Sequence, residues 1–206
     1  LSVEGLGKYK RLGTTIDDAL GEAFDKTAKL LGIEFPGGPK IEKFALKGNP
    51  NKFILPKPIF NKGGCNVSFA GLKTAILRIS KNLKTKKDKY DLAASFQKVI
   101  LEILKKKTKV AIDMYLKKNR SKKFVIAGGV ASNTLIRRTL IDLCKENNFE
   151  TFFPDFQYCC DNAAMIAMVG LEKFKLGKFD NSDFKANPRW ALDDKAKFLK
   201  GAGVKY

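Results

Sequence analysis

The sequence predicts an α/β fold, and three observations carry this prediction. The segment from Phe124 to Asn133 combines a short apolar run with paired glycines, which is typical of a strand that turns into a helix. A second apolar run, 149–153, precedes another helical pattern that ends at Gly177. A strand, a glycine turn, a helix, a strand and a helix in this order are typical of α/β proteins, in which ligands bind where strands end.

The N-terminal segment predicts a hairpin followed by an amphipathic helix. Residues 1–12 alternate loosely between apolar and polar side chains and contain two glycines, which favours a pair of strands. Thr15 begins a Thr-x-x-Asp pattern, so we expect it to cap a helix that ends at Gly32. A glycine inside a helix costs about 1 kcal/mol relative to alanine, so we expect another group to approach the backbone at Gly21.

Four carboxylates lie between residues 17 and 25, in a chain whose formal net charge is +19. We expect Asp17 and Asp18 to serve as capping residues. A Pro-Gly-Gly-Pro sequence follows at 36–39, and a helix-terminating turn is its simplest interpretation. Glu42, and Asp25 or Glu22 from the helix, offer carboxylates suited to ribose hydroxyls, although exposed acids more often belong to a solvated helix face.

Residues 46–123 predict a basic, mainly helical region. A short helix is expected after Gly71, and apolar residues recur at helical spacing over 91–118, with Lys105–Lys107 on a solvated face. The stretch 73–123 holds 17 Lys or Arg against 4 Asp or Glu, a balance typical of a nucleic-acid partner. Because 34 of the 40 basic residues in the chain are lysines, a general compositional bias explains the same excess, and both interpretations stay open.

Polar groups stand at the ends of both predicted strands of the C-terminal half. Gly128 and Gly129 let a flat ring or a phosphate approach the backbone, and Asn133 offers a donor and an acceptor to a base or sugar. A tight strand-to-helix connection with a capping Asn explains the same residues. Asp161 opens the last predicted helix, where it either caps the helix or binds a metal together with groups from elsewhere. The two adjacent cysteines before it are unsuited to sharing one ion.

Composition excludes several classes of protein. No apolar run approaches the roughly 20 residues that span a bilayer, so we expect no membrane partner. The four cysteines have no CxxC spacing, which fits a reducing cytoplasm. The chain contains no histidine and therefore lacks the commonest acid–base and metal-binding side chain.

Six segments, in order, resemble the tRNA threonylcarbamoyladenosine transferases, the TsaD or Gcp family once described as O-sialoglycoprotein endopeptidases. The resemblance covers the chain to about Leu192 and is carried by the segments 13–32, Pro36-Gly-Gly-Pro39, Ser68-Phe-Ala-Gly-Leu-Lys-Thr74, Ile126-Ala-Gly-Gly-Val-Ala-Ser-Asn133, Cys160-Asp-Asn-Ala-Ala-Met165 and Pro188-Arg-Trp190. It implies an actin-like, Hsp70-like ATPase fold, of which this chain would be the second lobe with a helical insertion. The expected parts are the acidic helix and Pro-Gly-Gly turn, the basic insertion, the nucleotide- and metal-binding part and a tail, at residues 1–45, 46–123, 124–192 and 193–206.

The resemblance also implies an activity. The threonylcarbamoyl group of threonylcarbamoyl-adenylate would be transferred to the N6 amine of adenosine 37 in tRNAs that read ANN codons. Asp161 is expected to bind one divalent metal ion, with iron favoured over zinc. The residues expected to contact the adenylate are Asp25, Gly38, Glu42 and Asn133. Besides tRNA, the implied partners are a paralogous TsaB-type subunit and a TsaE-type ATPase.

The chain departs from the family in two ways. The His-x-x-x-His pair that supplies the other metal ligands and a Ser-Gly-Gly phosphate loop are missing from it, and Ala70 and Cys160 stand where the family usually has Ser and Thr. We therefore expect the chain to be the C-terminal three-fifths of the enzyme and inactive by itself. The alternatives are a metal-dependent endopeptidase and a non-catalytic lobe that binds tRNA or a partner protein.

Overall fold

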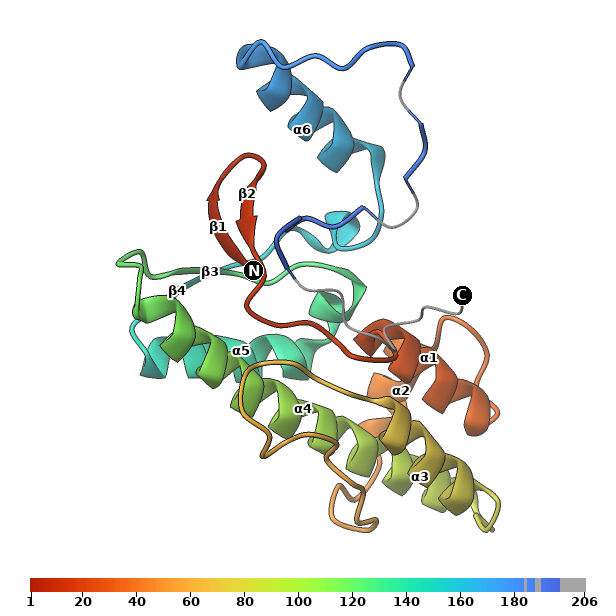
Figure 1. Ribbon diagram of the computed structural model, residues 1–206. Helices are drawn as coiled ribbons and strands as arrows, with labels where there is room; N and C mark the ends of the chain where they lie inside the picture. The colour runs from red at the N-terminus through yellow and green to blue at the C-terminus, as the bar shows by residue number, and fades with distance from the viewer. Residues whose placement is uncertain (184, 188–189, 197–206) are drawn as a thin grey trace.

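The body of the molecule is a group of helices packed around one long central helix, α4 (Figure 1). The structure is a computed structural model that describes residues 1–183, 185–187 and 190–196. The helices of the body are α1 (Leu20–Leu30), α2 (Gly37–Ala45), α3 (Ala70–Ser80), α4 (Lys86–Leu116) and α5 (Thr134–Glu146).

Helix α1 forms as the sequence predicts, because its apolar residues recur on one face. Ala23, Phe24, Ala28 and Leu31 are all buried, and the helix ends before Gly32, whose φ of +71° suits glycine. The ring of Phe24 meets that of Phe96 edge to face, with centroids 5.0 Å apart. Full burial of one such side chain contributes about 1.5–3 kcal/mol. This contact therefore fixes α1 against α4.

Helix α4 begins earlier than the apolar pattern predicts. Thr85 caps it and accepts a hydrogen bond from the amide of Asp88, whose carboxylate returns a bond to the Thr85 amide. At 1.5 Å per residue its 31 residues extend about 46 Å. The prediction of a solvated lysine face is wrong at Lys107, which is buried and donates to the carbonyls of Lys62 and Gly64 at 2.7 and 3.2 Å.

The predicted strands are present, so the α/β class is confirmed, but the sheets are small. Strands β1 (Ser2–Gly5) and β2 (Lys8–Lys10) form the expected antiparallel hairpin. Strands β3 (Lys123–Val125) and β4 (Glu150–Phe152) pair in parallel, with β3 leading through the 3-10 turn η1 (Gly129–Ser132) into α5. The segments that follow β3 and β4 therefore leave the sheet at the same edge, as required for a site at the strand ends.

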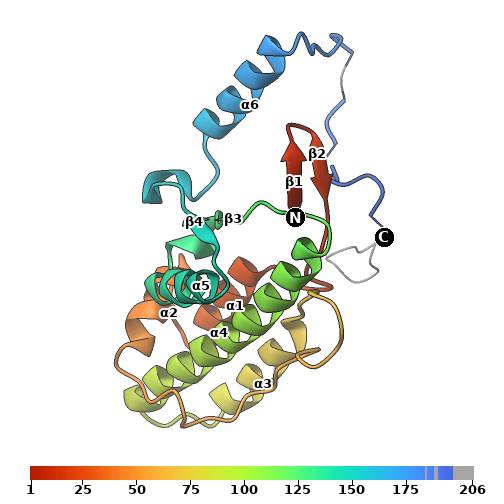
Figure 2. The same cartoon turned by 90° about the vertical axis from the view of Figure 1, so that its left-hand side faces the viewer.

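Helix α6 (Ala163–Lys175) stands apart from the body, beyond the β1–β2 hairpin (Figures 1 and 2). The structure describes every residue of it, and none is buried. Its exposed large apolar side chains are Met165, Ile166, Met168, Val169, Leu171 and Phe174. A soluble helix normally covers such an apolar surface against another element.

Three local predictions in the N-terminal half are wrong. Thr15 does not cap α1, because its hydroxyl donates to the carbonyl of Asp18 at 2.7 Å and the helix begins only at Leu20. The Pro-Gly-Gly-Pro sequence does not end a helix but starts α2, with Pro36 at the N-cap. No described residue crowds Gly21, since a Cβ there would make an ordinary contact of 3.7 Å with Val130.

The predicted divisions of the chain stay predictions. One apolar core takes residues from 1–45, 46–123 and 124–192 alike. Residues 197–206 of the predicted tail lie outside the described part of the structure. Pro188 and Arg189 of the last family segment lie outside it as well. Among the described helices, none is long and apolar enough to cross a membrane. All four cysteines are free thiols.

Candidate functional site

Four of the five predicted site residues either lie at the N-termini of α2 and α5 or hydrogen-bond to them with their side chains. Asp25 projects from α1 and its Oδ1 accepts a hydrogen bond of 2.9 Å from the amide of Gly37, the first residue of α2. A carboxylate at this position accepts a hydrogen bond from an otherwise free amide and interacts favourably with the positive end of the helix dipole. The backbone of Gly37 is pressed against α1, since a Cβ there would lie 2.6 Å from the Cβ of Ala28. Asp25 therefore holds the start of α2 in place.

Glu42 joins α2 to α5 in the same manner. Its Oε1 accepts a hydrogen bond of 2.8 Å from the amide of Thr134, the first residue of α5. The neighbouring Asn133 is the N-cap of α5: its Oδ1 accepts from the amide of Ile136, and its Nδ2 donates to Oε1 of Gln97, both at 3.0 Å. The interpretation of Asn133 as a cap is thus confirmed, and its contact with a ligand stays a prediction.

The glycines beside these residues leave the backbone open. Within 4 Å of a Cβ built on Gly38 or on Gly128, the described part of the chain has no heavy atom. Gly128 also has a φ of +93°, a conformation that favours glycine. At Gly129 the nearest atom to such a Cβ is Sγ of Cys160, at 3.9 Å. The segment that carries Asp161 therefore lies close to the glycine turn.

Asp161 is exposed and does not cap α6. The N-cap is Asn162, whose Oδ1 accepts a hydrogen bond of 3.0 Å from the amide of Met165. The interpretation of Asp161 as the helix cap is therefore wrong, because the next residue is the cap. Over the part of the chain that the structure describes, no three His, Cys, Asp or Glu side chains come together to hold a metal ion. One carboxylate does not hold a catalytic metal, so these residues do not form a complete metal site.

The acidic residues of α1 differ in their electrostatic surroundings. Lys26 forms ion pairs with Asp18 at 2.7 Å and with Glu22 at 2.6 Å. The hydrogen bond to Lys26 is the main cause of the lowered pKa of Glu22, and the charge of Lys73 is a smaller one. Asp25 instead bonds the amide of Gly37. Lys26 thus pairs with the two acids nearer the start of α1, whereas Asp25 faces a helix N-terminus.

Sequence reasoning missed the structural partner of Asp17. It does not cap α1 but accepts hydrogen bonds from the hydroxyl of Ser68 and, at 2.8 Å, from the amide of Phe69, directly before α3. No local pattern predicts these two bonds, because Ser68 and Phe69 lie 51 and 52 residues from Asp17.

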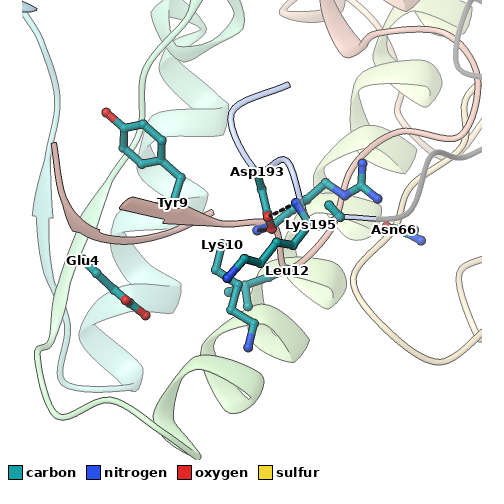
Figure 3. Close-up of a pocket in the computed structure, with 9 residues that line it drawn as sticks. Glu4, Tyr9, Lys10, Leu12, Asn66, Asp193 and Lys195 are labelled. Atoms are coloured by element: carbon teal, nitrogen blue, oxygen red, sulfur yellow. Dashed lines mark hydrogen bonds between the residues drawn. The ribbon is translucent and has the colours of Figure 1, made fainter. Parts of the chain in front are cut away.

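A pocket of about 550 Å³ lies elsewhere, between the hairpin and the segment 193–196 (Figure 3). Tyr9, Lys10, Leu12 and Asn66 line it, and Asp193 closes one side by accepting a hydrogen bond of 2.7 Å from the amide of Arg11. None of the predicted site residues lines this pocket. The two groups of residues are therefore separate features of the surface.

Comparison with known proteins places this chain in one family. A family model described as tRNA N6-adenosine threonylcarbamoyltransferase matches residues 1–168. A relative of that name from Pelagibacter ubique is 69% identical over 100% of this chain and 58% of its own length. Relatives of the same name from Rhodospirillum rubrum and Caulobacter vibrioides are 45% and 47% identical, over 98% and 99% of this chain and 58% and 56% of their own lengths. The chain thus spans less than two thirds of the length of these curated relatives.

Proposed function

The chain belongs to the tRNA N6-adenosine threonylcarbamoyltransferase family, and we propose on this basis that it supplies the adenylate-binding lobe of such an enzyme. The reaction is transfer of the threonylcarbamoyl group from threonylcarbamoyl-adenylate to the N6 amine of adenosine 37 in tRNAs that read ANN codons. Because the chain spans 58% of the length of its Pelagibacter relative, we assign turnover to the longer protein and binding of the adenylate to this part of it.

The observation that carries the proposal is the meeting of four predicted contacts at two helix N-termini. Asp25 and Glu42 each use one carboxylate oxygen to bond an amide of α2 or α5, which leaves the second oxygen of each for a ribose hydroxyl. Gly38 leaves the backbone of α2 accessible, and Asn133 lies at the start of α5.

These residues act by binding and orientation. The exocyclic amine of adenine is a weak nucleophile, so the carbamoyl carbon and the amine have to be held in a near-attack geometry. The carboxylates of Asp25 and Glu42 would bind the ribose, and the open backbone at Gly38 would lie against the nucleotide. Together they would hold the leaving group on one side of the reacting bond. The first lobe and the tRNA then define the other side.

The proposed actin-like fold has support in the uncovered surfaces of this chain. Parallel sheets are normally covered on both faces, yet Val125 of β3 is 67% exposed. The apolar side chains of α6 are exposed as well. We infer that the remaining part of a protein of the relatives' length covers these surfaces, as the first lobe of a two-lobed fold would.

Asp161 contributes one carboxylate to a divalent metal site in this proposal, with iron favoured and zinc the alternative. The remaining ligands belong to parts of the protein outside this chain, because its described residues offer no complete set. Such a metal, when bound, supplies Lewis acidity. The proximity of the Cys160 thiol to Gly129 supports a position of Asp161 beside the glycine turn.

The basic region supports tRNA binding, and the structure divides it into two groups. One runs from Lys73 to Lys89, over α3, the connection after it and the first turn of α4. The other runs from Lys105 to Lys123, over the C-terminal half of α4 and the connection to β3, and Lys98 lies between the two groups. Lys73, in the first group, acts electrostatically on Glu22 of α1. We propose that the first group faces tRNA, because Lys73 acts on Glu22 of α1, the helix that also carries Asp25. A TsaB-type subunit, a TsaE-type ATPase and a cytoplasmic location complete the proposal.

The experiment uses a chimera in which this chain replaces the matching part of the Pelagibacter relative. Purified chimera, threonylcarbamoyl-adenylate and tRNA are incubated, and modified adenosine 37 is measured by mass spectrometry of nucleosides. We expect transfer by the chimera and a loss of at least tenfold with Asp25→Asn or Glu42→Gln. The matched control is Glu34→Gln, an exposed acid that forms an ion pair with Lys40. Full activity of both site variants would contradict the proposed adenylate site.

A further inference from the structure

The segment before Asp161 has little apolar anchorage of its own. From Pro154 to Asp161, a stretch that the structure describes throughout, only Cys159 is buried. The short 3-10 turn η2 (Phe156–Tyr158) contributes no buried side chain. Burial of apolar surface, the usual source of stability, therefore cannot fix where this segment lies. Polar and aromatic contacts have to do so.

Arg137 makes these contacts from the second turn of α5. Its Nε donates to the carbonyl of Ala131 in the glycine turn. Its Nη2 donates to the carbonyl of Pro154 at 3.3 Å and to Sγ of Cys159 at 3.4 Å. One guanidinium thus bonds both segments that leave the β3–β4 sheet at its carboxyl edge.

Two aromatic rings hold the guanidinium in this position. Its central carbon lies 4.5 Å from the ring centroid of Phe153 and 4.2 Å from that of Phe156, which are distances of cation–π contact. Phe153 directly follows β4, and Phe156 begins η2. The planar, forked guanidinium can stack and donate in several directions at once, which a lysine ammonium cannot do.

We propose that Arg137 is a positioning residue that joins the glycine turn to the Asp161 segment, and so sets the place of Asp161 relative to Asn133. Arg137 and Asn133 lie one turn apart on α5, since the amide of Arg137 donates to the carbonyl of Asn133 at 3.0 Å. Helix α5 therefore positions both Asn133, the proposed adenylate contact, and, through Arg137, the segment that carries Asp161. The inference rests on the proposed function only for its consequence in catalysis.

The test compares Arg137→Met and Arg137→Lys with the matched control Arg138→Met in the chimera. Arg138 is the exposed neighbour on the same helix. Hydrogen exchange is followed in peptides covering 153–161 and, as a reference for global stability, in peptides of α4. For Arg137→Met we expect at least tenfold faster exchange in 153–161 with no change in α4. Arg137→Lys is expected to lie between this variant and the wild type, because it keeps the charge and loses the fork.

Steady-state kinetics supply the functional half of the test. Loss of a residue that orients a site typically costs 10–100-fold, so we expect kcat of Arg137→Met to fall by about that factor with an unchanged KM for tRNA. Unchanged exchange in 153–161, or faster exchange spread equally over α4, would overturn the positioning role. If the wild-type chimera transfers nothing, the proposed function fails, and the exchange pattern still decides the role of Arg137.

Discussion

The contact between α1 and α2 makes a sharp prediction for the two neighbouring glycines at the start of α2. A Cβ on Gly37 would lie 2.6 Å from the Cβ of Ala28 and 2.9 Å from both Cα and Oδ1 of Asp25. Carbon atoms in good contact lie about 3.5–4.0 Å apart. Two of the three obstructing atoms belong to the backbone or Cβ of α1, so they cannot rotate away. Gly37→Ala therefore has to move α2 away from α1.

The cost follows from two opposing effects. Overpacking of a tight contact typically costs about 1–3 kcal/mol, while alanine gains at most about 1 kcal/mol over glycine in a helix. That gain is smaller at Gly37, because it is the first residue of α2 and fewer helical hydrogen bonds depend on its conformation. We expect Gly37→Ala to lower the free energy of unfolding by about 1–2 kcal/mol. The hydrogen bond from the Gly37 amide to Asp25 is expected to weaken with it.

Gly38→Ala is the matched control, because no described heavy atom lies within 4 Å of a Cβ there. Its helix gain is reduced by Pro39, since a residue before proline avoids the helical region. We expect its free energy of unfolding to stay within about 0.5 kcal/mol of the wild type. The same methyl group would occupy the space proposed for the nucleotide, so binding of AMP or of a non-hydrolysable adenylate should weaken.

Urea denaturation of both variants, followed by circular dichroism, measures the difference. With a slope of about 2 kcal/mol per molar urea, the predicted 1–2 kcal/mol separates the two midpoints by about 0.5–1 M. Equal midpoints for Gly37→Ala and Gly38→Ala would refute the argument from packing. A Gly38→Ala protein that binds the nucleotide as well as wild type would instead refute the place assigned to the ligand.

Two further predictions concern ionisable groups. Asp91 accepts hydrogen bonds from Nζ of Lys87 at 2.5 Å and from the amide of Asn49 at 2.7 Å, and the bond to Lys87 is the main cause of its lowered pKa. Because the folded pKa lies below the ordinary value of 3.8, this stabilisation is present above that pH and is lost as the pH falls through the folded pKa. Asp91→Asn should therefore flatten the acid dependence of the unfolding free energy below about pH 4, and parallel curves for the two proteins would contradict this. Burial raises the pKa of Cys144 to about 11, whereas Cys160 is exposed; maleimide at neutral pH should label Cys160 first, and equal rates in the native protein would be evidence against the buried position of Cys144.

The elements that sequence reasoning predicted well are those whose signal is local. Helix α1 and the β3–turn–α5 unit depend on apolar spacing and glycines within a few residues of one another. The Thr-x-x-Asp pattern shows the limit of such signals. It caps α4 at Thr85, but at Thr15 the hydroxyl donates to the Asp18 carbonyl and no helix starts there. The same four-residue pattern therefore has two outcomes, and the surrounding chain decides between them.

Features that depend on distant partners could not be predicted. Lys107 is buried because the carbonyls at 62 and 64 accept its hydrogen bonds, and these residues lie 45 and 43 positions away. The Pro-Gly-Gly-Pro sequence favours a turn by composition, and it starts a helix because Asp25 supplies an acceptor to the Gly37 amide. The identities of the proposed site residues came from the resemblance to the family. Their convergence became visible only once both helix starts were placed.

The proposed adenylate contacts have a double role that decides how they can be studied. Asp25 and Glu42 each hold a helix N-terminus with one carboxylate oxygen and are proposed to offer the other to the nucleotide. Removing either side chain to the Cβ leaves a helix amide without its acceptor, so a loss of binding in an alanine variant could reflect a displaced helix. The amide variants keep an oxygen that accepts the backbone bond and remove the negative charge. A loss of adenylate binding in Asp25→Asn or Glu42→Gln, with α2 and α5 intact, therefore reports on the charge that faces the ligand.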